Sequence, residues 1–96
     1  MPKIQFGVKS SGFGVRVYPN PFSNITNIDY TIPDDGNVEM DLYNVLGEKV
    51  VTFVNSNLTA GVHEFSFNAS KLSSGVYFYS LETNGSSIVR KMMLLK

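Results

Sequence analysis

The feature that most constrains the fold is an Asn84-Gly85 turn joining two runs of β-forming residues near the end of the chain. Both central residues of a type I′ hairpin turn need a positive φ, and Asn-Gly is the pair that meets this need most readily. The runs cover residues 75–82 and 87–95. The sequence therefore predicts a terminal β-hairpin. Its last strand closes with Met92-Met93-Leu94-Leu95, and we expect this apolar run to be buried, bound by a partner, or both in succession.

Strand-like alternation of apolar and polar residues also recurs upstream, at residues 26–32, 38–43, 49–54 and 63–67, with a further strand near 14–17. Short strands at this spacing are typical of a β-sandwich, and no window keeps a helical period. We predict an all-β fold, an immunoglobulin-like antiparallel β-sandwich of about seven strands. Its buried face is expected to include Ile28, Tyr30, Val38, Met40, Leu42, Phe65, Phe67, Tyr79 and Leu81.

The connections between these strands carry recognisable turn residues. Gly47 ends a short connection and is expected at positive φ, because glycine lacks the Cβ that would clash there. Residues 55–57 and 60–61 are expected to break the chain between two strands, and residues 68–74 to form a loop with one helical turn. Tyr77 lies where the corner tyrosine of such a sandwich enters a late strand. It is either that corner residue or an ordinary core side chain.

The segment Tyr18-Pro19-Asn20-Pro21-Phe22 must lie at an edge or an end of the sandwich. Neither proline has an N–H, so neither fits a central strand. Tyr18 and Phe22 are its candidate anchors. The segment is then a stiff edge blocker. The alternative is a proline-rich recognition peptide.

Composition argues against several classes of function. Eight basic and eight acidic residues cancel, which gives no bulk charge for nucleic acid or anionic membranes. The chain has no cysteine for a thiolate metal site, and its one histidine, His63, shares a strand face with Phe65. The acidic cluster lacks calcium-loop spacing and is interpreted as a solvated turn: Asp34, Asp35, Glu39 and Asp41. We predict no enzyme activity, cofactor or metal site.

Residues 1–12 differ in character from the rest of the chain. They carry Gly7, Ser10, Ser11 and Gly12, and are interpreted as a linker or an artificial N-terminal extension. They lack the apolar core of a signal peptide. If the protein is exported, its signal is expected to lie upstream. Residues 13–96 are expected to form the domain.

Five blocks of the sequence resemble the type A C-terminal sorting domain of the type IX secretion system. They occur in the family's order and cover residues 18–96: Tyr18-Pro19-Asn20-Pro21-Phe22, Tyr43-Asn44-Val45-Leu46-Gly47-Glu48-Lys49-Val50, Ala60-Gly61, Ser74-Gly75-Val76-Tyr77-Phe78-Tyr79 and Lys91-Met92-Met93-Leu94-Leu95-Lys96. The chain departs from the family at Ser23-Asn24-Ile25-Thr26, where members often have Asp or Asn-Pro-Ser-Thr. One block alone would be weak evidence, whereas five in register are strong.

The resemblance implies a fold similar to the immunoglobulin-like domain of the flagellar hook-capping protein. It implies a non-catalytic signal that directs a cargo protein across the outer membrane of a Gram-negative bacterium, to the cell surface or beyond. The implied partners are the outer-membrane translocon, a cell-surface sortase-like peptidase and the upstream cargo domain of the same polypeptide, with no nucleic acid. The signature residues are expected to be structural: Tyr18, Pro19, Asn20, Pro21, Phe22, Gly47, Gly75 and Tyr77.

The residues expected to be recognised by the translocon are Lys91, Met92, Met93, Leu94, Leu95 and Lys96. A terminal strand often lies at a sheet edge, where a receptor can add a strand of its own. Two alternatives to a sorting signal remain at this point. One is a carbohydrate-binding sandwich, which would use exposed aromatics such as Tyr43, Phe53 and Phe78. The other is a passive structural module of a larger secreted protein.

Overall fold

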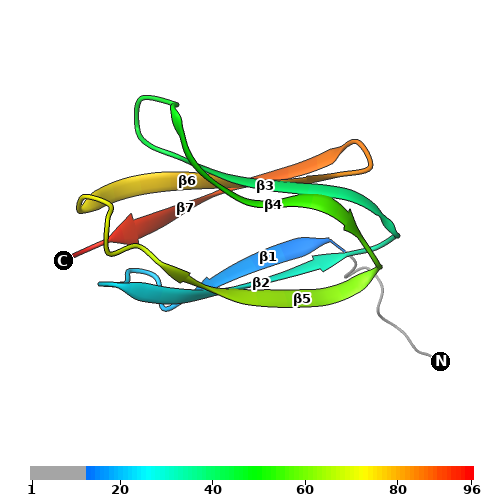
Figure 1. The fold of residues 1–96 in the computed structure, drawn as a ribbon, viewed down its shortest axis with the longest axis horizontal. Helices are drawn as coiled ribbons and strands as arrows, with labels where there is room; N and C mark the ends of the chain where they lie inside the picture. Colours follow the sequence, from blue (N-terminus) through cyan, green and yellow to red (C-terminus); the bar gives the residue numbers. More distant parts are fainter. Residues whose placement is uncertain (1–12) are drawn as a thin grey trace.

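A computed structural model describes residues 13–96 as two packed antiparallel sheets (Figure 1). This arrangement confirms the predicted all-β sandwich, while the expectation for residues 1–12 lies outside the described residues. No helix able to span a membrane occurs in this part of the chain. The seven strands are β1 (Gly14–Tyr18), β2 (Ile25–Ile32), β3 (Gly36–Tyr43), β4 (Lys49–Leu58), β5 (Gly61–Asn68), β6 (Gly75–Thr83) and β7 (Ser86–Leu94).

The strands divide into a three-stranded sheet of order β1-β2-β5 and a four-stranded sheet of order β4-β3-β6-β7. The chain changes sheet between β2 and β3, between β4 and β5, and between β5 and β6 (Figure 1). Strands β1, β5, β4 and β7 therefore lie at the sheet edges. The terminal strand is one of these, as expected.

The core lies between the sheets, on one alternating face of each strand. In the four-stranded sheet, Met40 is paired with Leu81, and Leu42 with Tyr79. The buried apolar residues are Val17, Phe22, Ile28, Tyr30, Ile32, Val38, Met40, Leu42, Ala69, Tyr77, Tyr79, Leu81, Met92 and Leu94.

Two residues of the predicted core are only half-buried, namely Phe65 and Phe67 on β5. Their side chains turn inward as predicted, but β5 is an edge strand and no further strand of residues 13–96 covers them. Strand parity predicts the direction of a side chain, whereas the extent of its burial depends on the neighbouring strand.

The predicted turns at Gly47 and at Asn84-Gly85 are confirmed. Gly47 has a φ of +82°, and the terminal hairpin turns at Asn84 and Gly85 with φ values of +50° and +82°. Asn44 organises the Gly47 connection, because its side-chain oxygen accepts hydrogen bonds from the N–H groups of Leu46 at 2.9 Å and Glu48 at 3.0 Å. The amide side chain thus replaces backbone partners inside the loop.

The predicted break at residues 55–57 is wrong. Strand β4 continues through these polar residues to Leu58, and Asn55 and Asn57 lie opposite Glu39 and Asn37 of β3. Asparagine favours turns because its side chain competes for backbone hydrogen bonds. Here the ladder with β3 satisfies the backbone instead, so long-range pairing overrides the local preference.

Candidate functional site: the terminal strand and its covered edge

The six residues predicted to be recognised divide between the two faces of the terminal strand. Met92 and Leu94 are 1% and 0% exposed and belong to the core. Met93 is half-buried on the opposite face, while Leu95, just beyond the strand, is 53% exposed. Lys91 and Lys96 flank this run and are exposed. The apolar end of the chain is therefore part core and part surface.

The Asn20 side chain holds the free edge of β7. Its Nδ2 donates a hydrogen bond to the carbonyl oxygen of Lys91 at 3.1 Å, and its Oδ1 accepts one from the N–H of Met93 at 3.0 Å. An amide side chain offers a donor and an acceptor side by side. It can therefore pair with the terminal strand much as another strand would.

Phe22 continues this pairing with its own backbone. Its N–H donates to the carbonyl oxygen of Met93 at 3.0 Å, and its carbonyl oxygen accepts from the N–H of Leu95 at 2.8 Å. These bonds form an isolated parallel bridge between Phe22 and Leu94. The Phe22 side chain is 4% exposed and anchors the segment in the core. The edge of the terminal strand is therefore occupied from Lys91 to Leu95, and the expectation that this edge is open to a receptor strand is wrong.

The rest of the signature segment is fixed to the three-stranded sheet. The Thr26 hydroxyl donates to the carbonyl oxygen of Pro19 at 2.7 Å, and both proline peptide bonds, Tyr18-Pro19 and Asn20-Pro21, are cis. Tyr18 is 40% exposed and does not anchor the segment in the core, contrary to expectation.

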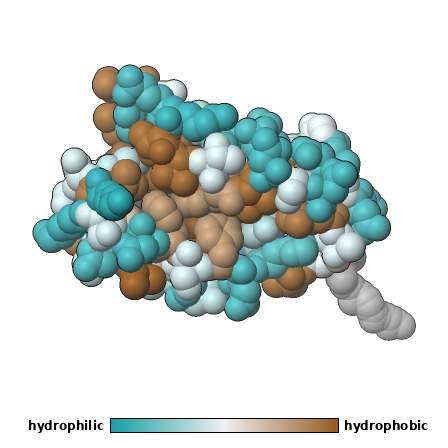
Figure 2. All heavy atoms as spheres, in the orientation of Figure 1, coloured by the Kyte–Doolittle hydropathy of each residue, from teal (hydrophilic) through white to brown (hydrophobic). Residues whose placement is uncertain are grey.

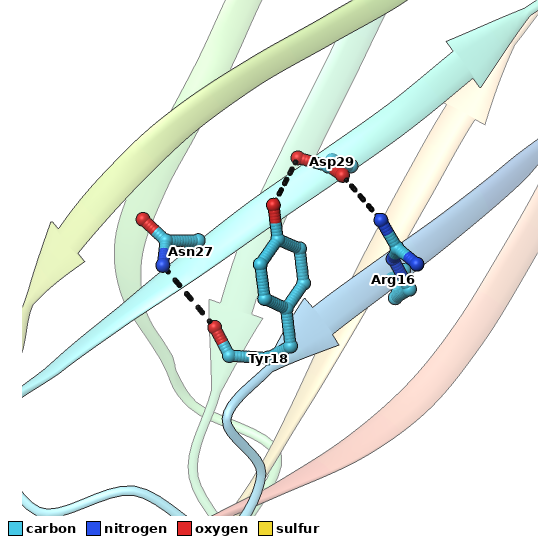
Figure 3. A network of polar contacts seen from close by, with 4 residues as sticks. All are labelled: Arg16, Tyr18, Asn27 and Asp29. Atoms are coloured by element: carbon cyan, nitrogen blue, oxygen red, sulfur yellow. Dashed lines mark hydrogen bonds and ion pairs between the residues drawn. The ribbon is translucent and has the colours of Figure 1, made fainter.

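Tyr18 belongs instead to a polar network on the outer face of this sheet (Figure 3). Its hydroxyl donates to Asp29 at 3.3 Å, and its ring lies 4.6 Å beneath the Arg16 guanidinium carbon. Arg16 in turn pairs with Asp29 at 2.9 Å, and this hydrogen bond raises the pKa of Arg16. Tyrosine can take such a position because its ring is amphipathic.

The loop before β6 supports the last residue from the other side. The N–H of Lys96 donates to the Ser74 hydroxyl at 3.0 Å, and the Lys96 ammonium donates to the carbonyl oxygen of Ser70 at 2.7 Å. Tyr77 donates its hydroxyl to the carbonyl oxygen of Ser73 at 2.7 Å. It is also 8% exposed, so both interpretations of this residue hold: it forms the corner and fills the core. Nothing in the sequence pattern indicated the serine contacts.

Two of the side chains considered for catalysis or metal binding, His63 and Asp35, have structural partners. His63 stacks on Tyr30 with ring centroids 5.4 Å apart, and its Nε2 lies 2.8 Å from the Thr59 carbonyl oxygen. Asp35 accepts a hydrogen bond from the N–H of Ala60 at 2.8 Å. Among residues 13–96, no three His, Cys, Asp or Glu side chains converge as a metal site would require.

The interpretation of the acidic cluster as a solvated turn is wrong for Asp41. This residue is only 3% exposed, on the outer face of the four-stranded sheet. Its carboxylate accepts a hydrogen bond from Thr52 at 3.0 Å and lies 3.6 Å from the Lys49 ammonium. This carboxylate is the main reason why the pKa of Lys49 is raised.

The three aromatics proposed for carbohydrate binding do not form one platform. Tyr43 and Phe78 lie opposite one another on the outer face of the four-stranded sheet. Phe53 lies on the inner side, where its ring centroid is 4.7 Å from that of Phe67. A flat sugar-binding surface would need these rings side by side, so their arrangement weakens this alternative.

Comparison with known proteins identifies the family of this chain. No curated protein matches the chain in sequence. A family described as the secretion system C-terminal sorting domain matches residues 16–95, which include the Asn20–Phe22 segment and the terminal strand that it covers. Domains of this family mark proteins for the cell surface or for secretion in Gram-negative Bacteroidetes. The chain belongs to this family of non-catalytic sorting signals, which direct proteins through the type IX secretion system.

Proposed function

We propose that the secretion machinery recognises the outward-facing side chains at the end of the sandwich, with the outer-membrane translocon as the receptor. The observation that carries this proposal is the covered edge of the terminal strand. Asn20 and Phe22 already bind the outward backbone groups from the Lys91 carbonyl to the Leu95 N–H. A receptor that meets the folded domain therefore has side chains, and not an open backbone edge, to recognise here.

The side chains available for recognition are two cations that flank an apolar pair, namely Lys91, Met93, Leu95 and Lys96. Met92 and Leu94 serve the core and not the receptor, because both are fully buried. Lys96 is held by Ser70 and Ser74, which gives the end of the chain a fixed position. A preorganised end costs a receptor less ordering entropy than a free tail would.

The further proposed partners are the upstream cargo of the same polypeptide and a sortase-like peptidase at the cell surface. We take residues 13–96 as the sorting unit, because the seven strands described in this range pair with one another and share one core cluster. A peptidase that removes this unit intact must cut before β1, since a cut within a paired strand would require that strand to leave its sheet first.

The test is surface delivery of a periplasmic reporter fused to residues 12–96. The full fusion should cross the outer membrane. Lys91→Ser with Lys96→Ser, and Met93→Ser with Leu95→Ser, should leave the reporter in the periplasm while the domain stays folded. Substitutions at exposed positions usually change stability by no more than about 0.5 kcal/mol. Because Met93 is half-buried, circular dichroism of each purified variant checks that the domain stays folded.

The matched controls lie on the same strand, outside the proposed surface. Arg90→Ser removes a neighbouring cation, and Val89→Ser removes an apolar side chain that is 61% exposed. Both should deliver the reporter normally. Equal delivery by all four variants would refute recognition through these side chains. Equal loss of surface delivery by all four variants would also refute it, because delivery would then depend on the stability of β7 and not on these particular side chains.

A further inference from the structure

Three of the four sheet edges carry features that disfavour pairing with another chain. Strand β1 is short and runs directly into Pro19 and Pro21. The last part of β7 is covered by Asn20 and Phe22. Strand β4 shifts register twice against β3 and begins with Lys49. Prolines, bulges, lysines and covering segments are the usual devices that keep an edge from pairing.

Strand β5 has none of these devices. All eight of its residues pair with β2 in an unbroken register, from Gly61 opposite Ile32 to Asn68 opposite Ile25. It contains no proline, lysine or arginine, and no strand among residues 13–96 lies on its other side. It runs along the bottom of the sandwich in Figure 1. Its outer backbone groups therefore form a straight edge that another strand can extend.

Partly buried aromatic side chains lie beside this edge, packed against the core. Phe65 and Phe67 turn inward from β5 and are half-buried, and Phe53 of β4 faces them with ring centroids 5.3 Å and 4.7 Å away. The space-filling view shows apolar surface along the middle of the molecule, between hydrophilic rims (Figure 2). A strand added to β5 would place every second side chain against these rings.

The outer face of the same sheet carries an incomplete row of charges. Arg16, Asp29 and Glu64 lie opposite one another on β1, β2 and β5. Arg16 pairs with Asp29 at 2.9 Å (Figure 3). Glu64 faces the same Asp29, is exposed, and has no ion pair among the described residues. Like charges directly opposite in a sheet are unfavourable, so the row lacks a cation on the far side of Glu64.

We propose that β5 is a docking edge for an extended strand of a partner protein that carries a lysine or arginine opposite Glu64 and apolar residues on either side of it. The backbone supplies the pairing, the apolar side chains cover Phe65 and Phe67, and the cation completes the charge row. A second copy of this chain does not fit through its own β5, because β5 has no lysine or arginine to place opposite Glu64. The terminal strand belongs to the other sheet, so this proposal is independent of the proposed recognition of β7.

The probe is a synthetic peptide, Thr-Val-Thr-Val-Lys-Val-Thr-Val-Thr, added to the isotope-labelled 96-residue chain. Its valines would face the inner side of the sheet, where Phe65 and Phe67 lie, and its lysine would lie opposite Glu64. Amide chemical shifts should change along β5 and not along β7. Glu64→Lys should weaken binding by about tenfold, because a cross-strand attraction becomes a repulsion. A peptide with glutamate in place of the central lysine should bind the Glu64→Lys variant more tightly than it binds the original chain.

The matched control is Glu82→Lys. Glu82 is also exposed and also faces an acidic residue, Glu39, but it lies on the four-stranded sheet. This variant has the same net charge as Glu64→Lys and should bind the lysine peptide as the original chain does. The proposal fails if neither peptide shifts β5, if both charge variants behave alike, or if the protein alone shows concentration-dependent shifts along β5, which would indicate self-pairing.

Discussion

Replacing Asn20 by alanine tests whether this side chain holds the terminal strand. The substitution removes one hydrogen bond to the Lys91 carbonyl and one from the Met93 N–H. Each hydrogen bond contributes about 0.5–1.5 kcal/mol net. Both contacts lie near the surface, where water replaces part of the loss, so the free energy of unfolding should fall by about 1–2 kcal/mol. For a domain of this size that is a drop in Tm of about 5–15 °C.

Urea unfolding followed by circular dichroism measures the stability, and amide hydrogen exchange locates the effect. The N–H of Met93 should exchange faster in Asn20→Ala. The N–H of Leu95 should keep more protection, because its acceptor is the Phe22 backbone. Asn57→Ala is the matched control, since Asn57 is an exposed asparagine with no side-chain hydrogen bond among residues 13–96. If Asn20→Ala and Asn57→Ala have the same stability and the same hydrogen-exchange rate at the Met93 N–H, the Asn20 side chain does not hold the terminal strand.

Three further changes test other parts of the fold. Gly47→Val should cost about 1–2 kcal/mol or more, because a β-branched residue is strained at a φ of +82°; an unchanged Tm would contradict this. Tyr77→Phe should cost about 1–3 kcal/mol in urea unfolding, because the Ser73 carbonyl loses its donor, and a loss of less than about 0.5 kcal/mol would show that water replaces the hydroxyl. Burial raises the pKa of Tyr79 above its ordinary value of 10.0. The unfolded chain therefore loses the Tyr79 proton at a lower pH than the folded domain does. The stability that the protonated, buried Tyr79 provides below pH 10 is lost as the pH rises through the folded-state pKa. Tyr79→Phe should therefore flatten the fall of Tm above pH 10, and an identical Tm profile for the two proteins would exclude a contribution from this group.

Local rules determined the strands and the turns of this protein. Alternation assigned Met40, Leu42, Tyr79 and Leu81 to one buried face, because side chains on a strand point to opposite sides in turn. Gly47 and the Asn84-Gly85 pair fixed their turns through their tolerance of positive φ. The family signature was also readable from the sequence, since its blocks occur in order along the chain.

Only the tertiary structure decided which backbone groups are free. The sequence predicted that the two prolines lie at an edge, but not that Asn20 and Phe22 cover the edge of the terminal strand some seventy residues later. It also did not show that, within residues 13–96, the outer edge of β5 has no partner strand and Phe65 is only half-buried. The physical reason is that side-chain direction follows from a two-residue local period, whereas strand order and edge exposure depend on contacts between segments far apart in the chain. The fold class could therefore be predicted from local sequence patterns, whereas the surfaces available to partners could not.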